Sequence, residues 1–101
     1  MAPVKLLMTW DLAPGRERDY FEFVTSEFEM GLRRLGVTLT DAWLTRYGKQ
    51  PQFLVGVEAE SYNKMLTVLN TSEWGSLRDR LAEFVTDFQW RVVRSSNRFQ
   101  M

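Results

Sequence analysis

The sequence predicts an α+β fold of the ferredoxin-like type, a sandwich in which helices cover one face of a four-stranded antiparallel sheet. Two observations predict it. Apolar residues alternate near both ends of the chain, which indicates strands, and recur at helical spacing between residues 16 and 35. The segments also follow one another in the order β-α-β-β-α-β, and two right-handed β-α-β units in that order place both helices on one face. The 101 residues suit a single domain spanning 1–101.

The first half of the chain predicts a strand and a long helix. Alternation marks the strand at Val4–Leu12, and Pro14-Gly15 marks a turn after it. From Arg16 to Leu35 apolar side chains return every three or four residues, and Gly36 follows as a helix stop.

The second half predicts a hairpin, an interrupted helix and a last strand. Val37–Tyr47 and Phe53–Glu60 are strand-like segments joined by the turn-rich sequence GKQPQ. Ser61 caps a helix that is interrupted near Asn70–Ser72, where Thr71 or Ser72 caps a second helical segment. The final strand is predicted at Asp87–Arg94.

The hairpin register assigns side chains to the two faces of the sheet. With Tyr47 opposite Phe53, Trp43 faces Val57, and facing residues project from the same side. A slip of one residue scatters the apolar residues over both faces, so the first register is preferred. The helix-facing side then collects Val4, Leu6, Met8, Trp10, Trp43, Tyr47, Phe53, Val55, Val57, Phe88, Trp90 and Val92.

The opposite face of the predicted sheet is polar apart from four aliphatic side chains. Such an apolar island on a polar surface indicates contact with a partner, and a second copy of a chain this small is the natural one. Arginines on this face are expected in interface ion pairs with Asp11 and Glu58. The candidates for a homodimer interface are Leu7, Leu44, Arg46, Leu54, Arg91 and Val93.

Composition excludes several classes of chemistry. The chain has no cysteine and no histidine, so thiolate nucleophiles, histidine bases and histidine metal or haem sites are impossible within it. Thirteen basic and thirteen acidic residues cancel, which predicts no nucleic-acid or membrane partner. No metal or cofactor is expected. The N-terminal apolar run is too short for a signal peptide, and a reducing cytoplasm fits the cysteine-free sequence.

Aromatic residues are the candidates for a ligand pocket between helices and sheet. Apolar walls with a few polar groups are typical of small-molecule sites, although packing alone also explains each of these residues. Tyr47, at the end of its strand, has a hydroxyl that can reach a ligand, whereas Asp41 and Asp11 act as bases only if desolvated. The pocket candidates are Trp10, Tyr20, Phe23, Trp43, Tyr47, Trp74 and Trp90.

The sequence also resembles the dimeric α/β-barrel superfamily, including its antibiotic-biosynthesis-monooxygenase-like and stress-responsive (Dabb-type) domains. The first strand leading into Pro14-Gly15-Arg16-Glu17 carries the resemblance, together with TSEWGSLRDRLAEFV leading to FQWRVV. It implies a homodimer with its sheets face to face and a ligand pocket in each protomer. Haem-degrading and chlorite-dismutase-like members use a histidine that this chain lacks, so those activities do not carry over. Cofactor-independent oxygenation of aromatic compounds stays open.

Two functions from different classes remain. One is a homodimer that binds an apolar or aromatic small molecule, with or without monooxygenase-like chemistry. The other is a non-enzymatic interaction or ligand-sensing domain whose core is filled by its own side chains.

Overall fold

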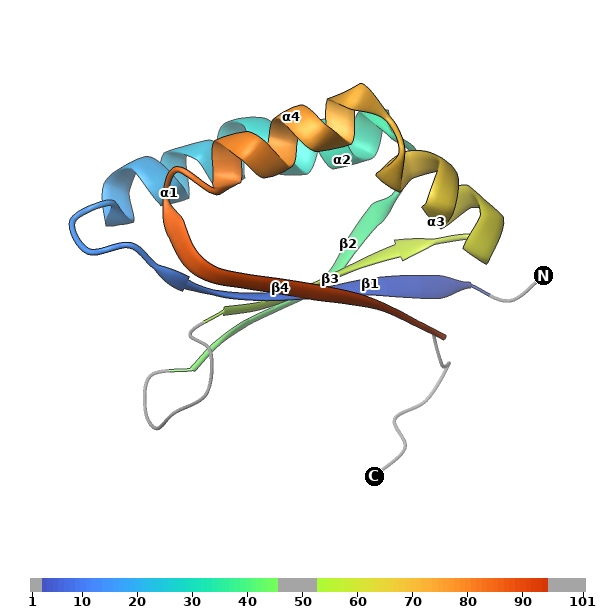
Figure 1. The fold of residues 1–101 in the computed structure, drawn as a ribbon, viewed down its shortest axis with the longest axis horizontal. Helices are drawn as coiled ribbons and strands as arrows, with labels where there is room; N and C mark the ends of the chain where they lie inside the picture. Colours follow the sequence, from blue (N-terminus) through green and yellow to red (C-terminus); the bar gives the residue numbers. More distant parts are fainter. Residues whose placement is uncertain (1–2, 46–52, 95–101) are drawn as a thin grey trace.

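A computed structural model describes residues 3–45 and 53–94 and has the predicted fold. One layer is a four-stranded antiparallel sheet in the order β2-β3-β1-β4, and the helices lie together on one face of it (Figure 1). The elements in chain order are β1 (Val4–Leu12), α1 (Glu17–Phe23), η1 (Val24–Phe28), α2 (Glu29–Arg34), β2 (Thr38–Leu44), β3 (Phe53–Ala59), α3 (Tyr62–Leu69), α4 (Ser72–Leu81) and β4 (Val85–Arg94).

The first helix is assembled from three pieces rather than being one continuous α-helix. Its middle piece, η1, is a π-helical turn. A π turn loosens the regular backbone ladder, and hydroxyl side chains bond neighbouring carbonyls here. Thr25 donates to the Phe21 carbonyl at 2.8 Å, and Ser26 donates to the Glu22 carbonyl at 2.5 Å. The helix ends before Gly36, whose φ of 84° favours glycine.

The predicted interruption of the second helix is present, and side-chain caps define it. Ser61 Oγ accepts from the Lys64 amide at 3.1 Å and starts α3. Thr71 Oγ accepts from the Trp74 amide at 3.1 Å and starts α4. Figure 1 shows α4 beside α2 above the sheet, while α3 turns down toward the end of the sheet where β1 begins.

An aromatic core fills the space between the helices and the sheet. Trp10 is fully buried at its centre, stacks on Phe88 with ring centroids 5.9 Å apart, and meets Phe28 edge-on. The helices themselves approach closely at Gly31, where an added Cβ would lie 2.6 Å from Leu77 Cδ1. Large rigid side chains packed in this way leave the core close-packed.

The predicted hairpin register is wrong, because Leu39 and not Trp43 pairs with Val57, and a bulge in β2 at Thr40 shifts the pairing by one further residue. Before the bulge Leu39 pairs with Val57 and faces the helices; after it Asp41 pairs with Gly56 and Trp43 with Leu54. The extra residue reverses the alternation, so Trp43 projects from the face without helices. Leu44 pairs with the buried Phe53 and therefore lies on the helix side, not on the predicted interface side. Arg46 and Tyr47 lie outside the described residues.

The last strand begins two residues earlier than predicted, at Val85. The pairing of β1 with β4 also contains an irregularity. Thr9 pairs with Gln89, but Asp11 pairs with Thr86, so the register shifts by one residue between them. Asp87 takes up the irregularity with a φ of 56°, a conformation that aspartate tolerates better than most residues.

Candidate functional site

The uncovered face of the sheet, called here the open face, has three rows of side chains that run across all four strands. The pairings that define the rows connect β2 to β3, β3 to β1 and β1 to β4. The first row is Trp43, Leu54, Thr9 and Gln89; the second is Asp41, Gly56, Leu7 and Arg91; the third is Thr38, Glu58, Lys5 and Val93.

The open face carries both a projecting indole and a shallow hollow. Trp43 is 63% exposed, unusually high for tryptophan, and stands on the edge strand β2. Toward the other edge, a hollow of about 300 Å³ is lined by Leu7, Thr9, Leu54, Gln89, Trp90 and Arg91. An exposed aromatic beside partly buried leucines is typical of a protein-binding surface.

An ion pair crosses the middle of the open face. Lys5 Nζ donates to Asp41 Oδ2 at 2.7 Å, so the carboxylate reaches from β2 over β3 to β1. Gly56 makes the crossing possible, because a Cβ there would lie 2.6 Å from the same oxygen. Thr40 donates a further hydrogen bond to the carboxylate at 3.0 Å. The bond from Lys5 holds the pKa of Asp41 below its ordinary value.

Four of the predicted pocket residues belong to the hydrophobic core. Trp10, Tyr20, Phe23 and Trp74 are all buried. Trp10 Nε1 donates to the Tyr20 hydroxyl at 3.1 Å, and burial raises the pKa of that phenol. Trp10 and Tyr20 therefore contact each other within the core.

The other predicted pocket residues are dispersed. Trp90 pairs with Met8 on the helix side but lies on the edge strand, where it is 48% exposed. Trp43 is on the open face, and Tyr47 is outside the described residues. The structure does not bring Trp43 and Trp90 together with the buried four.

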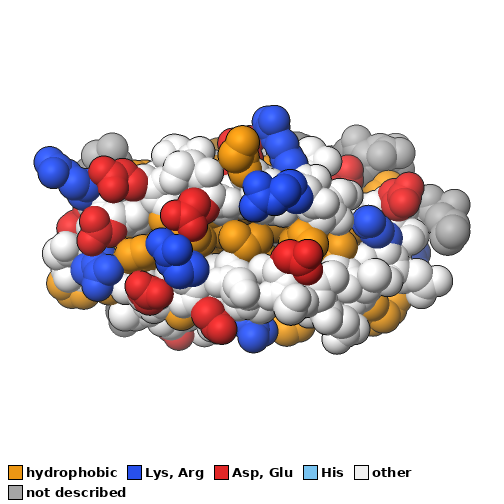
Figure 2. All heavy atoms as spheres, turned by 90° about the horizontal axis from the view of Figure 1, so that it is seen from above, with side chains coloured by type: hydrophobic (Ala, Val, Ile, Leu, Met, Phe, Trp, Pro, Cys, Tyr) orange, Lys and Arg blue, Asp and Glu red, His pale blue; other side chains and the backbone are white. Residues whose placement is uncertain are grey.

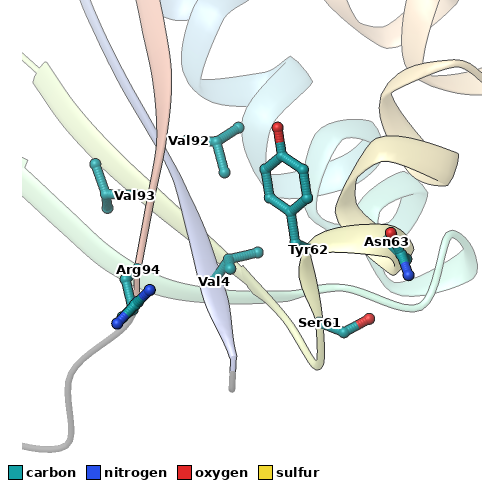
Figure 3. Close-up of a pocket in the computed structure, with 7 residues that line it drawn as sticks. All are labelled: Val4, Ser61, Tyr62, Asn63, Val92, Val93 and Arg94. Carbon is teal, nitrogen blue, oxygen red and sulfur yellow. The ribbon is translucent and has the colours of Figure 1, made fainter. Parts of the chain in front are cut away.

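A groove of about 450 Å³ lies at the end of the sheet, beside the start of α3. Figure 3 shows the Tyr62 ring standing next to Val92, with Val4 below them and Arg94 at the rim. Tyr62 is the first residue of α3, directly after the capping residue Ser61, and 54% of its surface is exposed. The lining residues are Val4, Ser61, Tyr62, Asn63, Val92, Val93 and Arg94.

Sequence reasoning did not identify this groove. Tyr62 stands three residues before Met65, at a spacing that fits the apolar stripe of α3. Periodicity therefore predicts a buried ring at Tyr62 and carries no signal for the groove. Among the described residues that line the groove, Arg94 is the one cationic side chain and none is acidic.

The helical surface carries a larger hollow of about 690 Å³ between α2 and α4, whose lining includes the charged side chains of Glu27, Arg34, Glu73 and Arg80. In Figure 2 basic and acidic side chains of both signs are mixed over the helices, with apolar side chains between them. Arg80 joins α4 to η1 through an ion pair with Glu27 at 3.2 Å, and its guanidinium carbon lies 5.5 Å from the centroid of the Phe23 ring. Within residues 3–45 and 53–94, acidic side chains form no group of three suited to a metal ion. None of the described helices is long and apolar enough to span a membrane.

Comparison with known proteins places the chain by its fold. No protein-family model matches the sequence, and no curated protein is significantly similar to it. A NIPSNAP family protein from Agrobacterium tumefaciens superimposes with a TM-score of 0.68 at 15% identity, over 95% of this chain and 88% of that one. A protein of unknown function from Rhodopseudomonas palustris gives a TM-score of 0.70 at 10% identity, over 96% and 85% of the two chains.

A third similar structure is described as a dimeric protein of unknown function with a ferredoxin-like fold, from Bacteroides fragilis. Its TM-score is 0.61 at 13% identity, over 94% of this chain and 98% of that one. At such identities the likeness concerns the fold. The structural neighbours thus include NIPSNAP proteins and a protein described as ferredoxin-like, and these neighbours do not confirm the narrower resemblance to monooxygenase-like and Dabb-type domains.

Proposed function

We propose that this chain is a self-association domain that forms a homodimer through the open face of its sheet. The observation that carries the proposal is Trp43, which projects from that face although indoles are normally buried. The filled aromatic core supports an interaction role, because the described helix–sheet interior is occupied by its own side chains. The dimeric state of the Bacteroides fragilis protein is consistent with it.

The surface chemistry fits a second copy of the same chain. Rows of mixed charge, with Lys5 and Arg91 among Asp41 and Glu58, are self-complementary rather than suited to a partner of one sign. Leu7 and Leu54 supply the apolar centre that a stable interface needs.

Sedimentation equilibrium tests the proposal. The wild-type chain should be a dimer at micromolar concentration, and Leu54→Asp should be a monomer because an unpaired charge would be buried in the apolar centre. Met30→Asp is the matched control, since Met30 is 57% exposed on the helical side, and it should stay dimeric. A monomeric wild type at about 100 μM, a concentration well above the Kd of a stable dimer, would refute the proposal.

The second candidate function is binding of a small apolar or aromatic molecule in the groove beside Tyr62. Its volume of about 450 Å³ lies within the usual range for small-ligand sites, and its wall is aromatic and aliphatic. Cofactor-independent oxygenation would need a base in addition, and the described lining contains no carboxylate. We therefore propose binding without chemistry.

A titration with 2-naphthoate followed by amide chemical shifts tests this candidate. Shifts should cluster at Val4, Tyr62 and Val92, and Tyr62→Ser should abolish them. Met30→Ser, an equally exposed position on α2, should not. Shifts spread over the core residues, or absent at millimolar probe, would rule the groove out.

A further inference from the structure

The three rows of the open face restrict how two copies can meet. A face-to-face homodimer has a two-fold axis lying between the sheets. In aligned packing, where the strands of the two sheets run within about 30° of each other, that axis runs either along the strands or across them. A pure rotation has no translation along its axis, so an axis along the strands fixes which row faces which. An axis across the strands does so when the middle rows of the two sheets lie over each other.

An axis along the strands, between β3 and β1, lays each row on itself with the strand order reversed. In the second row, Asp41 of one copy then faces Arg91 of the other. In the third row, Glu58 faces Lys5. Opposite charges meet in both rows, and such complementarity favours association in that register.

The same axis places the projecting indole over the hollow. In the first row Trp43 faces Gln89, which lines the hollow together with Leu7 and Leu54. Arg91 also lines it, and a guanidinium over an indole is a favourable contact. The indole of each copy therefore meets the hollow of the other.

An axis across the strands gives a poor match. It keeps each strand facing its own copy and exchanges the first and third rows. Asp41 then faces Asp41 and Arg91 faces Arg91, and Leu54 faces Glu58. Like charges opposed in this way destabilise an interface.

From these pairings we infer that the two-fold axis runs along the strands, with Asp41 of each copy paired to Arg91 of the other and Trp43 seated in the other's hollow. This inference rests on the proposed homodimer. Arg91 is suited to the role because it is exposed and makes no ion pair within the described residues. The usual angle of about 30° between packed sheets keeps these pairs within reach of each other.

Cross-linking measures the axis directly, and the chain contains no cysteine to interfere. Packed sheets lie about 10 Å apart, so a short bismaleimide can join facing positions that a disulfide cannot. The double variant Thr38→Cys/Val93→Cys places its thiols opposite each other in the third row and should give a covalent dimer. Within one copy these positions lie about 14 Å apart, which is three strand spacings.

Gln89→Cys/Val93→Cys is the matched control, with about 13 Å between its positions along one strand. This variant should give no covalent dimer if the two-fold axis runs along the strands. It should give a covalent dimer if the axis runs across them. Arg91→Glu should also weaken the dimer by about tenfold or more, because a carboxylate would then face Asp41, whereas Arg78→Glu on α4 should not.

The outcomes separate this inference from the function on which it rests. A dimeric chain in which only the Gln89/Val93 variant cross-links would overturn the axis and leave the homodimer intact. A dimer that Arg91→Glu leaves unchanged would also contradict the inferred pairing. A wild-type chain that stays monomeric would refute both the inferred axis and the proposed homodimer.

Discussion

Lys5 Nζ and Asp41 Oδ2 lie 2.7 Å apart although a whole strand separates β1 from β2. The contact is possible only because the intervening position on β3 is Gly56, which leaves the carboxylate room to lie over the backbone. Three residues on three strands therefore form one unit at the middle of the open face. Its parts should be energetically coupled, since residues in direct contact rarely act independently.

Gly56→Ala should destabilise the fold by about 1–3 kcal/mol, the usual cost of overpacking. The added Cβ would displace the carboxylate from Lys5. In an Asp41→Ala background the same change should cost at least about 1 kcal/mol less, because the clashing group is gone. Urea denaturation of the four proteins in this double-mutant cycle measures the coupling. Equal costs in both backgrounds would show that Gly56 serves another purpose.

The stability contributed by Asp41 should depend on pH in the acid range. Because the bond from Lys5 depresses the folded pKa of Asp41, its contribution is present above the unfolded pKa of about 3.9. It is lost as the pH falls through the folded pKa. The gap in unfolding free energy between the wild type and Asp41→Asn should therefore be constant from about pH 5 to 7 and shrink below about pH 4. A gap that persists unchanged to about pH 2 would contradict this assignment.

Tyr20→Phe should cost about 1–3 kcal/mol at neutral pH, because it leaves the buried Trp10 Nε1 without its acceptor. Burial raises the folded pKa of Tyr20, so its contribution is complete below the unfolded pKa of about 10 and is lost as the pH rises through the folded value. The difference from the wild type should thus narrow in thermal melts above about pH 10. Tyr62→Phe, at an exposed position, is the control and should change little at either pH.

Much of the fold followed from periodicity, since a packed core requires apolar residues at strand or helix spacing. The element order, the break at Asn70–Ser72 and the helix-facing residues of β1 were all predictable in this way. The side of the sheet from which Trp43 projects was not predictable from periodicity. Its alternation with Tyr47 and Asp41 is regular in the sequence, and only the pairing with β3 reveals that Thr40 is an extra residue.

The candidate site was harder to predict than the fold. A core tryptophan and a pocket tryptophan have the same spacing in a sequence, so Trp10 and Trp74 could not be told from ligand contacts. The open-face positions Leu7, Leu54, Arg91 and Val93 were placed on the correct side because their strands keep a regular register there.

The bulge at Thr40 decides which surface β2 presents. If Thr40 paired with Gly56 and the strand ran without a bulge, Asp41 and Trp43 would turn toward the helices, and Ala42 and Leu44 would lie on the open face. The central ion pair and the projecting indole would then disappear together, with every side chain retained. A switch between the bulged and the regular pairing is therefore a route by which such a domain gains or loses a partner without a substitution at the interface itself.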